Sequence, residues 1–256
     1  MKKWLLALLL LLMTGCSPAK PADPEIVVFA ASSLTEALDQ AIADYKSVAP
    51  EITVIPTYDS SGTLKTQIES GAACDLFISA SPAQMDALEA AGFLSEDTRV
   101  NLLQNQIVLA VPAGNPAGIT SFDQLANLLQ TGDVFLAIGN NDVPAGQYAR
   151  KIFDFYGIVE TDISPKLTYG SNVKEVTTQI SEATVDCGII YSTDAFSAGV
   201  AAVDSASAEM CGQVLYPAAI LSDSSNSSAA SAFLNYLAST DGGMLAFAQV
   251  GFSPAN

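Results

Sequence analysis

Apolar residues recur along this chain in two alternating patterns, one typical of strands and one typical of helices. Short apolar runs rich in β-prone residues predict strands at 26–31, 52–58, 75–80 and 106–111. Apolar positions at helical spacing predict helices at 34–45, 64–70 and 82–91. Strands that alternate with helices of this length indicate βαβ units on a parallel sheet.

A second series of the same kind begins after a proline-containing loop at 112–116. Its strands are predicted at 134–138, 166–169, 188–191 and 214–221. Its helices are predicted at 122–129, 147–156, 173–183, 232–238 and 243–250, with a serine-rich surface loop at 222–231. Two such series predict an α/β protein with two lobes. Residues 25–106 and 218–256 would form lobe 1, and residues 107–217 would form lobe 2.

The N-terminal segment follows neither pattern. Lys2 and Lys3 precede a run of ten apolar residues that ends at Met13, and Thr14-Gly15-Cys16 follows. A basic start, an apolar run of this length and a small-residue cleavage site are typical of a secretory signal. The run is shorter than the ~20 apolar residues that a membrane-spanning helix needs.

The cysteine that follows Thr-Gly is similar to the lipid-carrying cysteine of bacterial lipoprotein signals, with Met13 where leucine is usual. This resemblance implies that residues 1–15 are removed, that Cys16 carries the lipid, and that residues 16–24 form a Pro- and Ala-rich tether. A lipid holds a protein on a membrane surface without spanning it. We therefore expect a location on the extracytoplasmic face of the bacterial cell membrane.

Composition excludes several classes of function. The chain has 10 basic and 27 acidic residues, and without Lys2 and Lys3 its charge is −19. Nucleic-acid binding depends on clustered Lys and Arg, so it is disfavoured. No histidine is present, which excludes Ser-His and Cys-His nucleophilic pairs and most transition-metal sites.

Three cysteines, Cys74, Cys187 and Cys211, remain after Cys16. Outside the cytoplasm a disulfide is permitted, and Cys187–Cys211 is the pair nearest in sequence. The spacing leaves the pairing open.

Four strand-to-helix turns carry small or hydroxyl-bearing residues, at 30–34, 59–63, 143–146 and 169–173. Helix N-termini have unpaired N–H groups and a partial positive charge, and ligands of open α/β sheets sit beyond the carboxyl ends of the strands. The same turns also suit ordinary helix capping. Residues 33–36 fit a capping box, Ser61 and Ser171 are common cap residues, and Pro144 suits a first helical position. The turns alone leave both interpretations open.

Five blocks resemble the periplasmic molybdate-binding proteins of ABC transporters, and they occur in the same order. The blocks are VVFAASSLTEA (27–37), DSSGTL (59–64), CDLFISA (74–80), VPAGQYA (143–149) and GIIYSTDA (188–195). The resemblance runs from about residue 25 to residue 254, nearly the whole chain after the signal. It implies a two-lobe type II periplasmic-binding-protein fold with a small oxyanion in the interlobe cleft. It also implies the permease subunits of a molybdate ABC transporter as partners, no cofactor and no bare metal ion, and we expect a monomer.

The resemblance implies five ligand residues in this chain. Ser33 and Ser61 would give hydroxyl and backbone N–H groups from the first lobe. Ala145 and Val173 would give backbone N–H groups from the second lobe, and Tyr191 would give its hydroxyl. Because the residue before Ala145 is a proline without an N–H, Ala145 carries the first free donor of its helix.

Neutral donors suffice for a dianion because charge-assisted hydrogen bonds and helix dipoles stabilise it. A protonated oxyanion would need an acceptor, and none of the five positions supplies one from a side chain, which argues against phosphate. Molybdate and tungstate fit this cage equally well, and sulfate is a smaller competitor. Where the family often has a third serine, this chain has Gly62, so one hydroxyl is missing there.

Three other interpretations compete with this one. The protein could be a receptor for another tetrahedral oxyanion such as sulfate, or a non-transport sensor of the same fold. Acidic pairs such as Asp75 with Asp86 could in principle serve an enzyme. The Asp and Glu residues are scattered over helix faces, so we expect no enzyme here.

Overall fold

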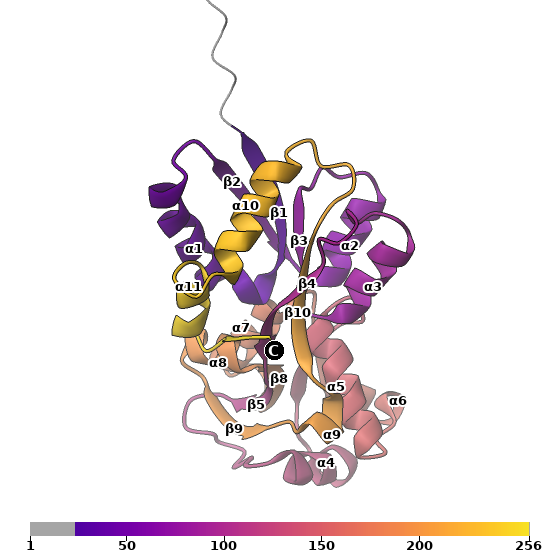
Figure 1. Cartoon of the computed structure of the whole chain (residues 1–256). Helices are drawn as coiled ribbons and strands as arrows, with labels where there is room; N and C mark the ends of the chain where they lie inside the picture. The colour runs from indigo at the N-terminus through magenta and orange to yellow at the C-terminus, as the bar shows by residue number, and fades with distance from the viewer. Residues whose placement is uncertain (1–23, 256) are drawn as a thin grey trace, which may run out of the picture.

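Two β-sheets organise the chain in the computed structural model, which describes residues 24–255 (Figure 1). The first sheet contains, in spatial order, β11 (Ser253–Pro254), β4 (Val100–Asn105), β10 (Val214–Ile220), β3 (Leu76–Ile78), β1 (Glu25–Ala31) and β2 (Thr53–Asp59). The second contains β7 (Leu167–Gly170), β6 (Leu136–Gly139), β8 (Cys187–Tyr191), β5 (Ile107–Val111) and β9 (Ala201–Ser205). Each sheet is the centre of one lobe.

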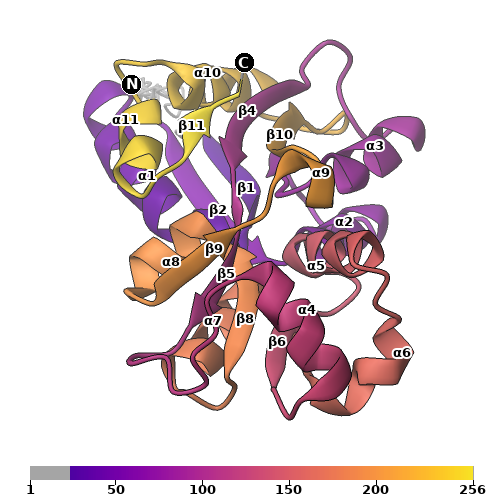
Figure 2. The ribbon, with the colours of Figure 1, turned by 90° about the horizontal axis from the view of Figure 1, so that it is seen from below.

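Helices cover both sheets (Figures 1 and 2). The first lobe has η1 (Ser32–Leu34), α1 (Thr35–Val48), α2 (Ser61–Glu69), α3 (Pro82–Ala90), α10 (Ser227–Ala238) and α11 (Met244–Gln249). The second has α4 (Phe122–Thr131), α5 (Pro144–Phe155), α6 (Glu160–Ile163), η2 (Ser164–Lys166), α7 (Val173–Ser181), α8 (Ser192–Ala198) and α9 (Ala208–Cys211). In Figure 1, α1, α10 and α11 lie on one side of the first sheet, and α2 and α3 lie on the other. None of the helices between residues 24 and 255 is long and apolar enough to cross a membrane.

The alternation of side chains along β1 explains this layering. Val28 and Ala30 are fully buried in the core that includes α1 and α10. Phe29, between them, points to the opposite face and packs with Phe77 and Leu64 in a smaller core under α2 and α3. Successive residues of a strand face opposite sides, so a continuous apolar run is what a sheet covered on both faces requires.

The sheets are mixed, and the predicted α/β class is confirmed. β1 pairs in parallel with β2 and β3, and β6 pairs in parallel with β7 and β8. The antiparallel strands are those next to the points where the chain passes between lobes. β10 runs antiparallel to β3 and β4, and β5 runs antiparallel to β8 and β9.

Two segments connect the lobes. Gln106 alone separates β4 from β5, and the segment after β9, which contains α9, leads back into β10. The sequence interpretation assigned residues 107–217 to lobe 2. All of β10, from Val214 onward, pairs within the first sheet.

The hydrophobic pattern did not predict several elements, because they are short or half exposed. They are β4, α6, α8, β9, α9 and β11. α10 begins at Ser227, inside the segment predicted to be a serine-rich loop, because its alanines favour helix and Ala230 and Phe233 are buried. α5 begins at Pro144 and α2 at Ser61, each three residues earlier than predicted.

The suggested Cys187–Cys211 disulfide is not formed. Cys74, Cys187 and Cys211 are buried free thiols. The thiol of Cys187 lies 4.0 Å from the carbonyl oxygen of Phe135, whereas that of Cys211 lies 3.8 Å from the carbonyl oxygen of Ser207. The proposed signal and Cys16 lie outside the described residues.

Candidate functional site

A small cavity lies where the two lobes meet. About 10 Å³ of it is open to the centre of a water-sized sphere, roughly what one water molecule needs. Its walls come from both lobes and consist of Ala31, Ser32, Ser33, Asp59, Ser60, Ser61, Ala80, Val143, Pro144, Val173 and Tyr191. The structure thus brings together turns that are more than a hundred residues apart in the sequence.

Four of the five predicted ligand residues line this cavity. Ser33 lies in η1, Ser61 is the first residue of α2, Val173 is the first residue of α7, and Tyr191 ends β8. All four are between 0 and 4% exposed. The fifth, Ala145, is not in the wall itself but directly follows a wall residue, Pro144, as the second residue of α5.

The backbone N–H groups of these residues are suited to bind an anion. Ser61, Ala145 and Val173 lie in the first turns of their helices, where no carbonyl one turn earlier is available within the helix. Three helix N-termini and the turn before α1 therefore converge on one point. Each terminus adds a partial positive charge.

The capping interpretation fails for Ser33 and Ser61, because neither side chain caps a helix. Ser60 caps α2 by accepting a hydrogen bond from the N–H of Thr63 at 3.1 Å, and Asn172 caps α7. The Ser61 hydroxyl instead accepts from the N–H of Ala80 at 3.0 Å. The capping box at residues 33–36 does not form.

The Ser33 hydroxyl belongs to a buried polar chain. It lies 2.9 Å from the hydroxyl of Tyr216, which in turn lies 3.3 Å from the side-chain nitrogen of Asn105. The orientation of the Asn105 amide follows from its oxygen, which accepts hydrogen bonds from Gln106 and Ser192. Because the amide nitrogen can only donate, the Tyr216 hydroxyl oxygen accepts its hydrogen bond, and the Tyr216 hydroxyl can donate to the oxygen of Ser33. The Ser33 hydroxyl hydrogen is then free to point into the cavity.

Tyr191 places a second hydroxyl-bearing side chain in the wall of the cavity. Its ring packs edge-on against Tyr148 and Tyr216, and its hydroxyl donates to the carbonyl oxygen of Ala80 in the other lobe at 3.3 Å. Burial raises the pKa of Tyr191 well above its usual value. The hydroxyl therefore keeps its proton and remains a donor.

The wall of the cavity carries no Lys or Arg, and its one charged side chain is Asp59. One carboxylate oxygen of Asp59 accepts the N–H of Ser60 at 2.7 Å. A carboxylate repels a dianion. The presence of Asp59 in the wall is therefore not explained by a site made of hydrogen-bond donors alone. Asp59 lies in one of the four turns found in the sequence but was not predicted to be a ligand, and no feature of the sequence indicated that Tyr216 or Asn105 would belong to the site.

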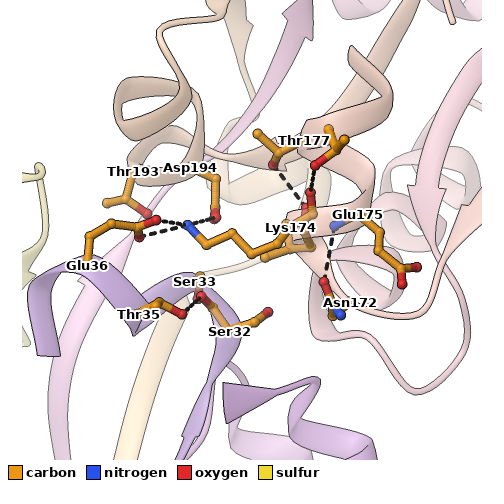
Figure 3. Close-up of polar contacts among 12 residues, drawn as sticks. Ser32, Ser33, Thr35, Glu36, Asn172, Lys174, Glu175, Thr177, Thr193 and Asp194 are labelled. Carbon is orange, nitrogen blue, oxygen red and sulfur yellow. Dashed lines mark hydrogen bonds and ion pairs between the residues drawn. The ribbon is translucent and has the colours of Figure 1, made fainter. Parts of the chain in front are cut away.

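A charged cluster crosses the cleft beside the cavity (Figure 3). Lys174, next to Val173, lies 2.7 and 2.8 Å from the two carboxylate oxygens of Glu36 on α1. It also lies 3.3 Å from one oxygen of Asp194 on α8. Among the described ion pairs, Lys174–Glu36 is the one that joins the two lobes.

Asp194 is the unusual member of this cluster. Its side chain is fully buried, and neither of its carboxylate oxygens accepts a hydrogen bond from a described residue. Burial raises its pKa from 3.8 to about 6, although Lys174 acts in the opposite direction. The ionised carboxylate is therefore destabilised in the folded protein.

Residues 26–252 match the family model described as a bacterial extracellular solute-binding protein. The chain belongs to this family. YvgL of Bacillus subtilis (strain 168), whose name describes an ABC transporter substrate-binding lipoprotein, is 33% identical over 250 residues, which are 95% of this chain and 94% of YvgL. The molybdate-binding protein ModA of Haemophilus influenzae is 32% identical over 231 residues, which are 90% of each chain.

Solved structures of other binding proteins have the same fold as this solute-binding protein. The periplasmic molybdate-binding protein of Azotobacter vinelandii superposes with a TM-score of 0.79 at 17% identity, covering 90% of this chain and 100% of that one. The sulfate-binding protein SubI of Mycobacterium tuberculosis H37Rv superposes with a TM-score of 0.75 at 17% identity, covering 91% and 88%. The predicted two-lobe periplasmic-binding fold is confirmed, and the protein is an extracytoplasmic solute-binding protein of the ModA-like type rather than an enzyme.

Proposed function

We propose that this solute-binding protein captures molybdate or tungstate and delivers it to an ABC importer. The observation that carries the proposal is the cavity between the lobes, where neutral donors from four turns surround a space for one compact group. The ligands would be the hydroxyls of Ser33 and Tyr191 and the backbone N–H groups of Ser33, Ser61, Ala145 and Val173. The ModA relative supports the choice of oxyanion.

The chemistry of the donors favours a dianion over a neutral solute. Charge-assisted hydrogen bonds are roughly twice as strong as neutral ones, and a buried site screens them little. The small volume of the cavity disfavours organic solutes, which need pockets of hundreds of Å³.

Asp59 bears on the choice between oxyanions. An ion that keeps a proton near neutral pH, such as phosphate, needs an acceptor, and the Asp59 carboxylate is an acceptor in the wall. The groups proposed above as ligands, which do not include Asp59, act as donors and favour an unprotonated dianion. Phosphate is therefore an essential competitor in any binding test, together with sulfate.

The proposed partners are the membrane permease subunits of the importer. The protein would act as a monomer held on the outer face of the cell membrane by a lipid on Cys16. The lipoprotein name of the YvgL relative supports the anchor.

Titration calorimetry of the purified protein with molybdate, tungstate, sulfate and phosphate tests the proposal. We expect tight one-to-one binding of molybdate or tungstate, much weaker binding of sulfate, and no heat with phosphate. Tighter binding of phosphate or sulfate than of either metal oxyanion would refute the assignment.

A further inference from the structure

Gly62 makes a backbone hydrogen bond between the lobes. Its N–H donates a hydrogen bond to the carbonyl oxygen of Asp142 at 3.0 Å. Gly62 is buried in the first turn of α2 in the first lobe, and Asp142 lies in the loop before α5 in the second. The neighbours of both residues, Ser61 and Val143, line the anion cavity.

There is no room for a side chain at this position. A Cβ atom built on Gly62 would lie 2.8 Å from the Cα and 2.9 Å from the carbonyl carbon of Asp142, and closer still to its carbonyl oxygen. Carbon atoms in contact are normally separated by about 3.5–4.0 Å. Every atom in this overlap belongs to the backbone of the opposite lobe, so no side-chain rotation can relieve it.

The loop that carries Asp142 cannot move aside easily. Asn140 ties it down, because its N–H donates to the carbonyl oxygen of Gly170 and its side-chain oxygen accepts the N–H of Asp142, both at 2.9 Å. Behind the loop, a Cβ on Gly146 would lie 2.7 Å from the carbonyl oxygen of Asn140. The start of α5 thus already packs against the loop backbone.

The start of α2 is fixed as well. Ser60 caps it, and the Ser61 hydroxyl accepts from the N–H of Ala80. Gly62 lies in a helical turn and does not have a positive φ, so alanine fits its backbone without strain. With both sides held, only separation of the lobes can accommodate a Cβ.

We propose that Gly62 sets how closely the two lobes close over the cavity, and thereby how tightly the bound oxyanion is held. This inference rests on the proposed function. The missing hydroxyl at this position is then not simply a lost ligand. It is replaced by an interlobe backbone contact that a serine would prevent. Gly62 acts as a positioning residue, since it is not part of the cavity wall.

The test is the variant Gly62→Ala, with molybdate as the probe in calorimetry. We expect affinity to fall on the order of tenfold or more, the usual consequence of overpacking a tight contact. Gly132→Ala is the matched control, because Gly132 ends α4 away from the cleft and the atoms nearest to a Cβ there belong to Leu128 of the same helix. Asp142→Ala, which keeps the carbonyl group, should bind within about twofold of the wild type.

A second measurement separates closure from folding. Spin labels at Glu51→Cys and Asp133→Cys, one exposed position in each lobe, report the interlobe distance in a Cys16→Ser background. The native thiols Cys74, Cys187 and Cys211 are buried. With molybdate, Gly62→Ala should retain a longer distance than the wild type, while its ligand-free melting temperature is unchanged or higher.

Two results would overturn the role of Gly62. One is affinity and distance equal to the wild type in Gly62→Ala, and the other is a lower ligand-free melting temperature, which would place the defect in folding. Failure of the wild type to bind either molybdate or tungstate would instead refute the proposed function. In that case the spin-label distances measured without ligand test the role of Gly62. Gly62→Ala should lack the shortest interlobe distances that the wild type shows, and identical distance distributions in the two proteins would count against the proposed role.

Discussion

Replacement of Asp194 by asparagine should stabilise the protein at alkaline pH. The ionised carboxylate is fully buried without a hydrogen bond, and its pKa is raised from 3.8 to about 6. Each pKa unit corresponds to 1.36 kcal/mol, so the ionised form costs the folded state about 3 kcal/mol relative to the unfolded chain. The asparagine side chain would carry no charge. Lys174 would keep its other partner, Glu36, so the substitution leaves no buried unpaired cation.

The effect depends on pH in a defined direction. Above about pH 6 the carboxylate is ionised in both states, and the full cost is present. Between about pH 6 and pH 4 the folded state binds a proton that the unfolded state does not, so acidification stabilises the wild type at this residue. The advantage of Asp194→Asn should therefore shrink as the pH falls.

Urea unfolding followed by far-ultraviolet circular dichroism measures this difference. At pH 8 we expect Asp194→Asn to be more stable than the wild type by up to about 3 kcal/mol, a midpoint shift of about 1 M or more for a typical urea dependence. At pH 4.5 the two should agree within about 1 kcal/mol. Asp241→Asn, at an exposed position, controls for the loss of one negative charge. A variant less stable at pH 8, or an advantage that persists at pH 4.5, would refute the reasoning.

Three further predictions concern the site and the anchor. Ser33→Ala and Tyr191→Phe should each weaken oxyanion binding by about 1.5–3 kcal/mol in calorimetry, the range for a hydrogen bond to a charged partner; unchanged affinity in both would remove these residues from the site. Glu36→Gln should raise the oxyanion dissociation rate about twofold to fivefold in low salt, measured by stopped-flow displacement, because a partly exposed ion pair contributes about 0.5–1 kcal/mol. That rate should depend less on salt than the wild-type rate, and equal salt dependence would show that the Lys174 pair does not hold the lobes. Cys16→Ala should move the protein from the membrane fraction to the soluble fraction, and retention at the membrane would disprove the lipid anchor.

Local patterns were sufficient to predict most of the fold. β1 and α1 bury whole faces, so their apolar positions repeat with the period of the element, and the sequence revealed both. β9 and α8 are short and partly exposed, and too few of their residues face a core for a period to be visible. The four turns could be found because the carboxyl ends of parallel strands meet at one edge of a sheet.

The contacts that finish the site could not be predicted, because they join distant parts of the chain. Tyr216 is 183 residues from its partner Ser33, and Asp142 meets Gly62 only when the lobes pack together. Local sequence marked Gly62 as a lost hydroxyl, whereas its importance lies in what approaches it from the other lobe. The sequence did not single out Asp194, since its burial and its ion pair with Lys174 arise only when α7 packs against α8.

The position of β10 within the first sheet dictates an order of assembly. β10 lies between β3 and β4, so until residue 220 has been synthesised the sheet is divided in two and β3 has an unpaired edge. The second sheet uses only residues 107–205, a continuous stretch of chain that is complete earlier. During synthesis, the first lobe is therefore begun before the second lobe but completed after it.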